Sequence, residues 1–369
     1  MGRVRSGARA ELTASVGIVD DGVDVNAPRA QGQWALAWRR FKRDRVAVGC
    51  AVFLLLLVFA VGPGAPLYGK LVGHGPNDFF PYAVSVGLRP AGPFTVTYAT
   101  HEVAGDDPYA LKHPPPPKGT GKTLLLLGAD SSLGRDEFMR VLYGGRVSLE
   151  VAAGAAVVAI LLGMLLGALA GYFGGWVDAV ISRFTDLVMA FPLLLFLVMI
   201  GSLFSYGLTR WTFHGALNQG VFQLVVIIGA FTWFYPARIV RAQIQSLRNR
   251  EFVEAAQMVG ARDTRIVRTH LLPHVVPPLL AYGTLLVATN IMIEVGVTFL
   301  GAGIKLPTAS WGSLLAQTWG SILNPNPYNP ATTQPWLTLC PSIAIFLTVF
   351  ALNQFGEGLR EATDPRSVR

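Results

Sequence analysis

Long apolar runs separated by polar segments are the dominant pattern along this chain. A helix rises about 1.5 Å per residue, so a run of about 17 to 27 residues can cross a hydrocarbon core of roughly 30 Å. The runs are unbroken and do not alternate in polarity, which favours helices over the strands of a membrane barrel. The pattern predicts an all-α membrane protein with six transmembrane helices, approximately at residues 46–67, 147–173, 187–204, 221–237, 275–304 and 336–355.

The composition fits a protein that lies in a lipid bilayer. The 369 residues are 52% hydrophobic and 14% charged, and the mean hydropathy of +0.45 is well above that of a soluble domain. Cys50 and Cys340 both fall within predicted spans and lack the spacing of a metal or redox motif, so we interpret them as packing residues. We expect no bound metal and no cofactor.

The formal charge of +8 would fit a nucleic-acid partner, but its distribution indicates a membrane instead. With a cytoplasmic N-terminus, roughly twenty of the 30 Lys and Arg residues lie on the cytoplasmic side, as the positive-inside rule requires. The two short outer loops keep one each, Arg210 and Lys305, and the remainder fall in a long first loop that the rule exempts. We therefore expect a multi-pass protein of the cell membrane with both termini in the cytoplasm and no nucleic-acid partner.

The first loop, between the first two runs, contains four consecutive prolines, Pro114 to Pro117, and a possible short strand from Phe94 to Tyr98. We expect a mostly irregular segment there that either contacts an outer partner or acts as a spacer. Near the N-terminus, aromatic residues at helical spacing lie beside basic ones, which fits either an interfacial helix or a simple topology signal. The expected organisation is a disordered cytoplasmic extension at 1–33, a basic amphipathic helix and first span at 34–68, an extracytoplasmic loop at 69–132, a core with five spans at 133–358, and a cytoplasmic tail at 359–369.

Residues 243–274 are too polar to cross the membrane and separate the fourth run from the fifth. Helical spacing begins at Glu251 and places Phe252, Ala255, Ala256 and Val259 on one side. Gly260 fits the turn that ends a helix. The first half of this segment therefore predicts a short helix that stops at a glycine.

A second short helix is expected to follow, capped by Asp263 or Thr264 and ending before Pro273. Two short helices joined at a glycine make a compact knob that can seat in the groove of a partner. Three arginines make the knob basic, which suits either an acidic cleft or lipid headgroups: Arg262, Arg265 and Arg268.

The spacing of this segment resembles the EAA loop of ATP-binding-cassette (ABC) importer permeases, the element that docks into a cytoplasmic ATPase. The sequence Glu-Ala-Ala is followed after three residues by Gly, and after nine more by His-x-Leu-Pro. By this resemblance the residues that couple the permease to its ATPase are Glu254, Ala255, Ala256, Gly260, Leu272 and Pro273.

Further motifs resemble the dipeptide, oligopeptide and nickel importer subfamily, and in particular its second permease subunit. They are Leu-Gly-Arg-Asp from 133, Ala-Gly-Tyr-Phe-Gly-Gly-Trp-Val-Asp from 170, Ala-Phe-Pro from 190, Phe-Leu-Gly-Ala-Gly from 299 and Ser-Trp-Gly from 310. The resemblance implies a type I ABC importer permease with the MetI-like fold and no catalytic activity of its own. It also implies a heterodimer with a related permease, two cytoplasmic ATPase subunits and an extracytoplasmic substrate-binding protein. Peptides are the expected cargo, with nickel or another small solute as the alternative.

Glycines recur every four residues in the second run, at Gly163, Gly167 and Gly171, and would let a neighbouring helix approach closely. Glu294 lies deep in the fifth run, where an ionisable group is costly. We expect the glycines to form a packing seam. Glu294 either faces the translocation pathway or pairs with another helix.

Two other classes of protein fit this sequence less well. The sequence from Gly119 to Thr123 resembles the end of a phosphate-binding P-loop, but Pro116 stands where the first glycine is required and the segment is predicted to lie outside the cell. An ion-driven secondary transporter is the alternative from another class. Such proteins show internal repeats and several buried charges, and neither is evident in this chain.

Overall fold

The computed structural model describes residues 38–84, 90–100, 120–130, 133–207, 220–323 and 334–363. Within these residues four continuous helical stretches are long and apolar enough to cross a membrane, and two bent helix pairs meet the same criterion if each pair is one span. The continuous stretches are Arg45–Val72, Glu137–Phe173, Asp263–Phe299 and Trp336–Thr363.

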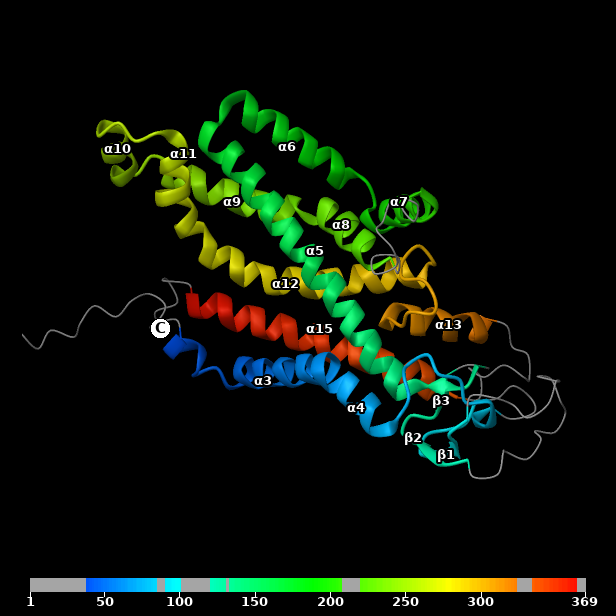
Figure 1. Cartoon of the computed structure of the whole chain (residues 1–369). Coiled ribbons are helices and arrows are strands. Elements are labelled where there is room, and N and C mark those ends of the chain that lie inside the picture. The colour runs from blue at the N-terminus through cyan, green and yellow to red at the C-terminus, as the bar shows by residue number, and fades with distance from the viewer. Residues whose placement is uncertain are drawn as a thin grey trace, which may run out of the picture.

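The long helices form a bundle around α5 (Glu137–Phe173) and α12 (Leu272–Phe299) (Figure 1). Helix α5 packs on α8 (Val221–Thr232), α9 (Phe234–Leu247) and α12, whereas α12 packs on α15 (Trp336–Thr363). Helix α3 (Arg45–Phe59) lies at the edge of the bundle against α15 and continues through a π turn, Ala60–Gly64, into α4 (Ala65–Val72). The all-helical prediction is therefore confirmed for the membrane part of the chain.

The third apolar run is not a single straight helix. Helix α6 (Gly175–Ala190) and helix α7 (Leu193–Gly207) meet at 87°. The residue before a proline is disfavoured in helical conformation, and Phe191, which precedes Pro192, has φ −87° and ψ 142°. The prediction of one span from 187 to 204 is wrong at its start, because residues 187–190 belong to α6.

The fourth run bends more gently. Helices α8 and α9 meet at 42° across Trp233, and Pro236 lies in the first turn of α9. Helix α9 then continues to Leu247, ten residues beyond the predicted end of the span, with a polar surface. It carries the chain out of the apolar bundle toward the segment predicted as a knob.

The chain between α4 and α5 folds into a small subdomain with two antiparallel strand pairs. Strand β1 (Thr95–Tyr98) pairs with β2 (Lys122–Leu125), and β3 (Ala129–Asp130) pairs with β4 (Arg135–Asp136). The predicted strand near residue 96 is thus confirmed. Of the residues that resemble a P-loop, Lys122 and Thr123 lie in β2. The proline run, Pro114 to Pro117, lies outside the described residues.

Buried charges tie this subdomain to the start of α5. Asp130 accepts from both Arg135 and Arg140, with N–O distances of 2.7 Å. Asp136 caps α5 by accepting from the Met139 amide, and burial raises the pKa of its carboxyl above the usual value. Asp130 therefore links β3 and β4 to the first turn of α5, although Glu137 Oε1 and Arg140 Nη2 are buried there without a hydrogen-bond partner among the described residues.

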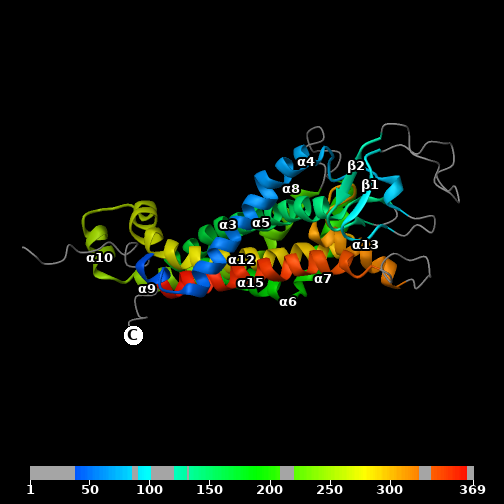
Figure 2. The same cartoon turned by 90° about the horizontal axis from the view of Figure 1, so that it is seen from below.

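The molecule has two distinct ends along its long axis. Helix α10 (Glu251–Met258), the end of α15 and the start of α3 lie at one end, and β1 and β2 lie at the other, in both views (Figures 1 and 2). We call the first the elbow end, after the segment predicted as a knob, and the second the hairpin end. Helix α5 runs between them.

Candidate functional site

The elbow, residues 248–265, connects α9 to the start of the long stretch that contains α12. Figure 1 shows α10 projecting beyond the ends of the bundle helices. Glu251 and Glu254 lie in the first turn of α10, where carboxylates complement the positive end of the helix dipole. These two carboxylates therefore stabilise the first turn of α10.

A glycine ends α10 in a Schellman motif. The Ala261 amide donates to the Ala256 carbonyl at 3.0 Å, and the Gly260 amide donates to the Gln257 carbonyl at 2.9 Å. Gly260 has φ +82°, a left-handed conformation that costs other residues about 1–2 kcal/mol. The predicted glycine turn is thus present, and it reverses the chain so that the elbow folds back toward the bundle.

One face of α10 is anchored and the opposite face is open. Val253 is fully buried against Ile266, Leu271 and Val275. The apolar side that the sequence predicted is anchored only in part. Ala256 packs against the same cluster and Phe252 stacks on His274 of α12, whereas Ala255 is exposed. Val253 is the anchoring residue because it faces the π turn Ile266–Leu271. The position of that turn relative to α10 cannot be deduced from the spacing of apolar residues in the sequence.

The exposed tip of the elbow is apolar. Met258 is 83% exposed and Val259 is 89% exposed, and both precede Gly260 directly. Large exposed apolar side chains that lie beyond the membrane helices are typical of a binding surface. The tip is therefore a candidate surface for contact with a partner.

The second half of the elbow differs from the prediction. Helix α11 (Asp263–Arg265) passes into a π turn, Ile266–Leu271, and then directly into α12. Pro273 does not end a helix, because it occupies the first turn of α12, where the missing amide is tolerated. Neither Asp263 nor Thr264 caps α11, since the N-cap residue is Arg262 and its side chain makes no capping hydrogen bond.

The structure therefore places the six predicted coupling residues in two groups. The first group lies on α10 and the turn after it, where all members except the half-buried Ala256 are exposed: Glu254, Ala255, Ala256 and Gly260. The second group, Leu272 and Pro273, lies at the root where α12 begins.

The glycines of α5 face α9 at close range. A Cβ at Gly163 would lie 2.5 Å from Cβ of Pro236, and one at Gly167 would lie 2.5 Å from the Ala237 carbonyl oxygen. At Gly171 the corresponding distance to the Arg241 carbonyl oxygen is 2.9 Å. The two backbones are thus in direct contact along three turns, which is the geometry of small residues in membrane helix pairs.

Glu294 is fully buried and hydrogen-bonded through both carboxylate oxygens. The Ser148 hydroxyl donates to Oε2 at 2.8 Å, and the Thr298 hydroxyl donates to Oε1 at 2.9 Å. Ser148 Oγ also accepts from the amide of Trp311, the first residue of α13 (Trp311–Leu323). Glu294 therefore joins α5, α12 and the start of α13.

Two ion pairs join α6 to α9. Asp178 accepts from Arg241 at 2.5 Å and 2.7 Å, and Asp186 accepts from Arg238 at 2.7 Å. In the described residues both α6 and α9 pack on α5, and the long arginine side chains of α9 reach the aspartates of α6.

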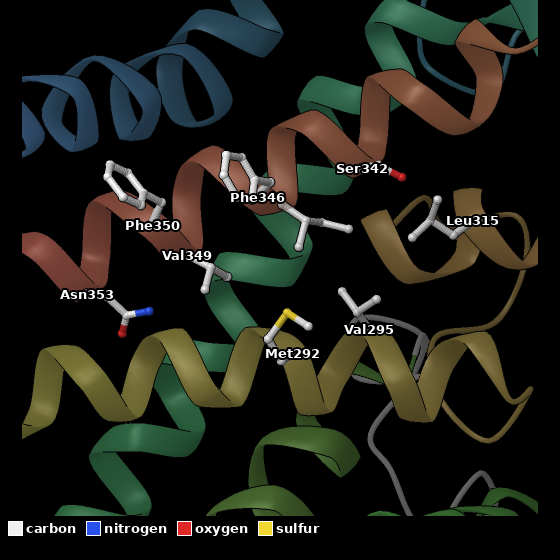
Figure 3. A pocket seen from close by; sticks show the side chains of 9 residues that line it. Met292, Val295, Leu315, Ser342, Phe346, Val349, Phe350 and Asn353 are labelled. Carbon is white, nitrogen blue, oxygen red and sulfur yellow. The ribbon is translucent and has the colours of Figure 1, made fainter.

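A groove of about 450 Å³ opens between α12, α13 and α15 (Figure 3). Its lining is apolar except for Ser342 and Asn353. It offers no charged side chain for the termini of a peptide. The elbow is accordingly the better defined candidate site.

Comparisons with known proteins identify the family of this chain. The family model described as "Binding-protein-dependent transport system inner membrane component" matches residues 163–369, and the model of the N-terminal transmembrane domain of oligopeptide transport permease C matches residues 32–78. The oligopeptide transport system permease protein OppC of Escherichia coli K12 is 41% identical over 239 residues, covering 65% of this chain and 72% of the relative. A putative peptide permease of Brucella ovis is 32% identical over 340 residues, covering 92% of this chain and 93% of the relative.

Among solved structures, an inward-facing form of the MetNI methionine ABC transporter matches with a TM-score of 0.45 and 18% identity, covering 60% of this chain and 96% of that chain. The family match extends over more than half of the chain and contains α6 to α15, including the elbow. The chain therefore belongs to the binding-protein-dependent inner membrane components, the non-catalytic permease subunits of ABC importers.

Proposed function

We propose that this permease moves oligopeptides across the cell membrane and that the elbow couples it to separate ATPase subunits. The observation that carries the coupling role is the exposed apolar tip, Met258 and Val259, held on a helix that projects beyond the bundle. The peptide cargo is supported by the names of the relatives, which are oligopeptide and peptide permeases.

In this mechanism the ATPases supply the energy and the permease supplies the path. ATP binding draws the two ATPase subunits together, and each carries with it the elbow seated in its groove. The anchored face of α10 transmits that movement, because Val253 packs on the π turn and on Val275 of α12. The membrane helices then turn as rigid bodies between two packed arrangements.

The remaining partners follow from the importer architecture. A second, related permease completes the translocation path, and an extracytoplasmic binding protein delivers the peptide at the hairpin end. The elbow end is cytoplasmic in this proposal, together with both termini of the chain. The basic residues in and next to the elbow support that orientation, since Arg250, Arg262 and Arg265 of the elbow and Arg268 of the following π turn are all exposed.

The test is to place a charge on the tip of the elbow. In Val259→Asp a carboxylate replaces an apolar side chain that is solvent-exposed in the isolated chain, so folding should be unaffected. We expect the variant to reach the membrane at the parent level, to lose its ATPase subunits on affinity purification, and to lose ATP-dependent uptake of a radiolabelled pentapeptide. Unchanged ATPase recovery and unchanged uptake would show that the elbow is not the docking element.

A further inference from the structure

The two roots of the elbow, at Arg248 and Asp263, are both attached to the same point of the bundle, the C-terminal end of α5. On the first root, Arg248 directly follows α9. Its Nη1 donates to the carbonyl oxygens of Gly171 and Tyr172, at 3.4 Å each. These carbonyls are in the last turn of α5, where backbone acceptors lack helical partners and carry partial negative charge. Arg248 thus holds the first root on the end of α5.

The second root is held by a side chain of the same turn. The Tyr172 hydroxyl donates to Oδ1 of Asp263 at 2.6 Å, and the Gln257 side chain of α10 also acts on this hydroxyl. The short distance is typical of a hydrogen bond to a charged acceptor. Tyr172 therefore contacts both arms of the elbow, one residue from each.

The helix held in this way connects the two ends of the molecule. Helix α5 has 37 residues and is about 55 Å long at 1.5 Å per residue. It is packed backbone to backbone against α9 through its glycines, and its first residues are joined to the buried ion pairs of the hairpin end. A displacement of the elbow that carries the end of α5 with it therefore reaches the opposite end of the protein.

We propose that Tyr172, Arg248 and Asp263 form a clasp that makes α5 follow the elbow, with the Tyr172 hydroxyl as a positioning group for energy coupling. The proposal rests on the proposed function of the elbow. It assigns to Tyr172 a role separate from docking, because the clasp lies at the roots of the elbow and the docking tip lies at Met258 and Val259.

The experiment compares Tyr172→Phe, which removes only the hydroxyl group, with a control. In the control, Tyr143→Phe, the same group is removed near the other end of α5. The importer is purified with its ATPase subunits, and uptake of a radiolabelled pentapeptide and ATP hydrolysis are measured together in proteoliposomes. For Tyr172→Phe we expect full recovery of the ATPase subunits and ongoing hydrolysis, with about three- to ten-fold less peptide imported per ATP, the scale of one lost hydrogen bond at a solvent-exposed position. Tyr143→Phe should retain the parent ratio.

A second comparison separates the hydrogen bond from general damage. Asp263→Asn keeps an acceptor oxygen for Tyr172 and should couple nearly as well as the parent, whereas Asp263→Ala should behave like Tyr172→Phe. A parent-like ratio in both Tyr172→Phe and Asp263→Ala would overturn the clasp, as would loss of the ATPase subunits from Tyr172→Phe. The proposed function is overturned separately, by a Val259→Asp variant that keeps its ATPases and its uptake.

Discussion

At the scale of single residues, two of the sequence features that stood out are explained by different physical needs. Gly167 is required by space, because any Cβ would overlap the Ala237 backbone. Gly260 is required by backbone conformation, because nothing lies within 4 Å of its Cβ position while its φ is +82°. Glycine spacing in the sequence predicted both positions, but only the structure distinguishes the two reasons.

Glu294 is explained at the same scale by its hydrogen bonds. It was predicted either to line the pathway or to pair helices, and in this structure both of its oxygens are engaged by hydroxyl groups of α5 and α12. Replacement by alanine would leave Ser148 and Thr298 without their acceptor in a buried site.

We therefore expect Glu294→Ala to reduce the free energy of unfolding by about 1–3 kcal/mol, the cost of buried polar groups left unpaired. Glu294→Gln retains an acceptor oxygen and should lose much less. The measurement is the thermal unfolding midpoint of each detergent-solubilised variant beside the parent. If Glu294→Ala unfolded at the parent temperature, the carboxylate would not be holding α13 in place.

At the scale of elements, hydrophobic runs predicted the helices well and their interruptions poorly. The long second, fifth and sixth runs appear as α5, α12 and α15, because an apolar stretch in a bilayer must satisfy its backbone internally. The full break at Pro192 could not be predicted, since proline in an apolar run either kinks a helix or ends it, and the neighbours decide which. The partners of Asp178 and Asp186 could not be predicted either, because sequence spacing shows only local pairs and the arginines come from α9.

The elbow was predicted in outline and corrected in detail. The glycine turn and the first helix were evident from spacing, whereas the anchoring by Val253 and the π turn into α12 depend on tertiary packing. Tyr172 belongs to the motif that begins at residue 170, but nothing in the sequence indicates its hydrogen bond to Asp263, 91 positions away.

A prediction at this scale concerns the turn that ends α10. Gly260→Ala places a Cβ in the left-handed region at a cost of about 1–2 kcal/mol, which shifts the elbow from its folded conformation. We expect peptide uptake to fall while membrane insertion is retained, and Gly260→Trp to act more strongly. Gly260→Asn is the matched control, since asparagine adopts this conformation more readily. Equal uptake by all three variants, each stably inserted, would contradict a mechanical role for the turn.

At the scale of the whole molecule, the two ends of the protein differ in structure and in chemistry. The elbow end has an exposed apolar tip and exposed arginines, and the hairpin end has a subdomain with buried ion pairs. Helix α5 spans the distance between them and contacts both. An importer needs this arrangement, because the energy is delivered on one side of the membrane and the cargo arrives on the other.

The orientation of these ends is the last prediction, and it decides whether the elbow can meet an ATPase at all. Cys50 and Cys340 are replaced by alanine, and single cysteines are introduced as Val259→Cys in the elbow and Val96→Cys in β1, where the native side chains are 89% and 58% exposed. With a thiol reagent that cannot cross membranes, we expect intact cells to be labelled at position 96 and not at position 259. After permeabilisation both positions should react, because both side chains are accessible to water. Labelling of position 259 in intact cells would place the elbow outside, where no ATPase can reach it, and would overturn the coupling mechanism together with the clasp that depends on it.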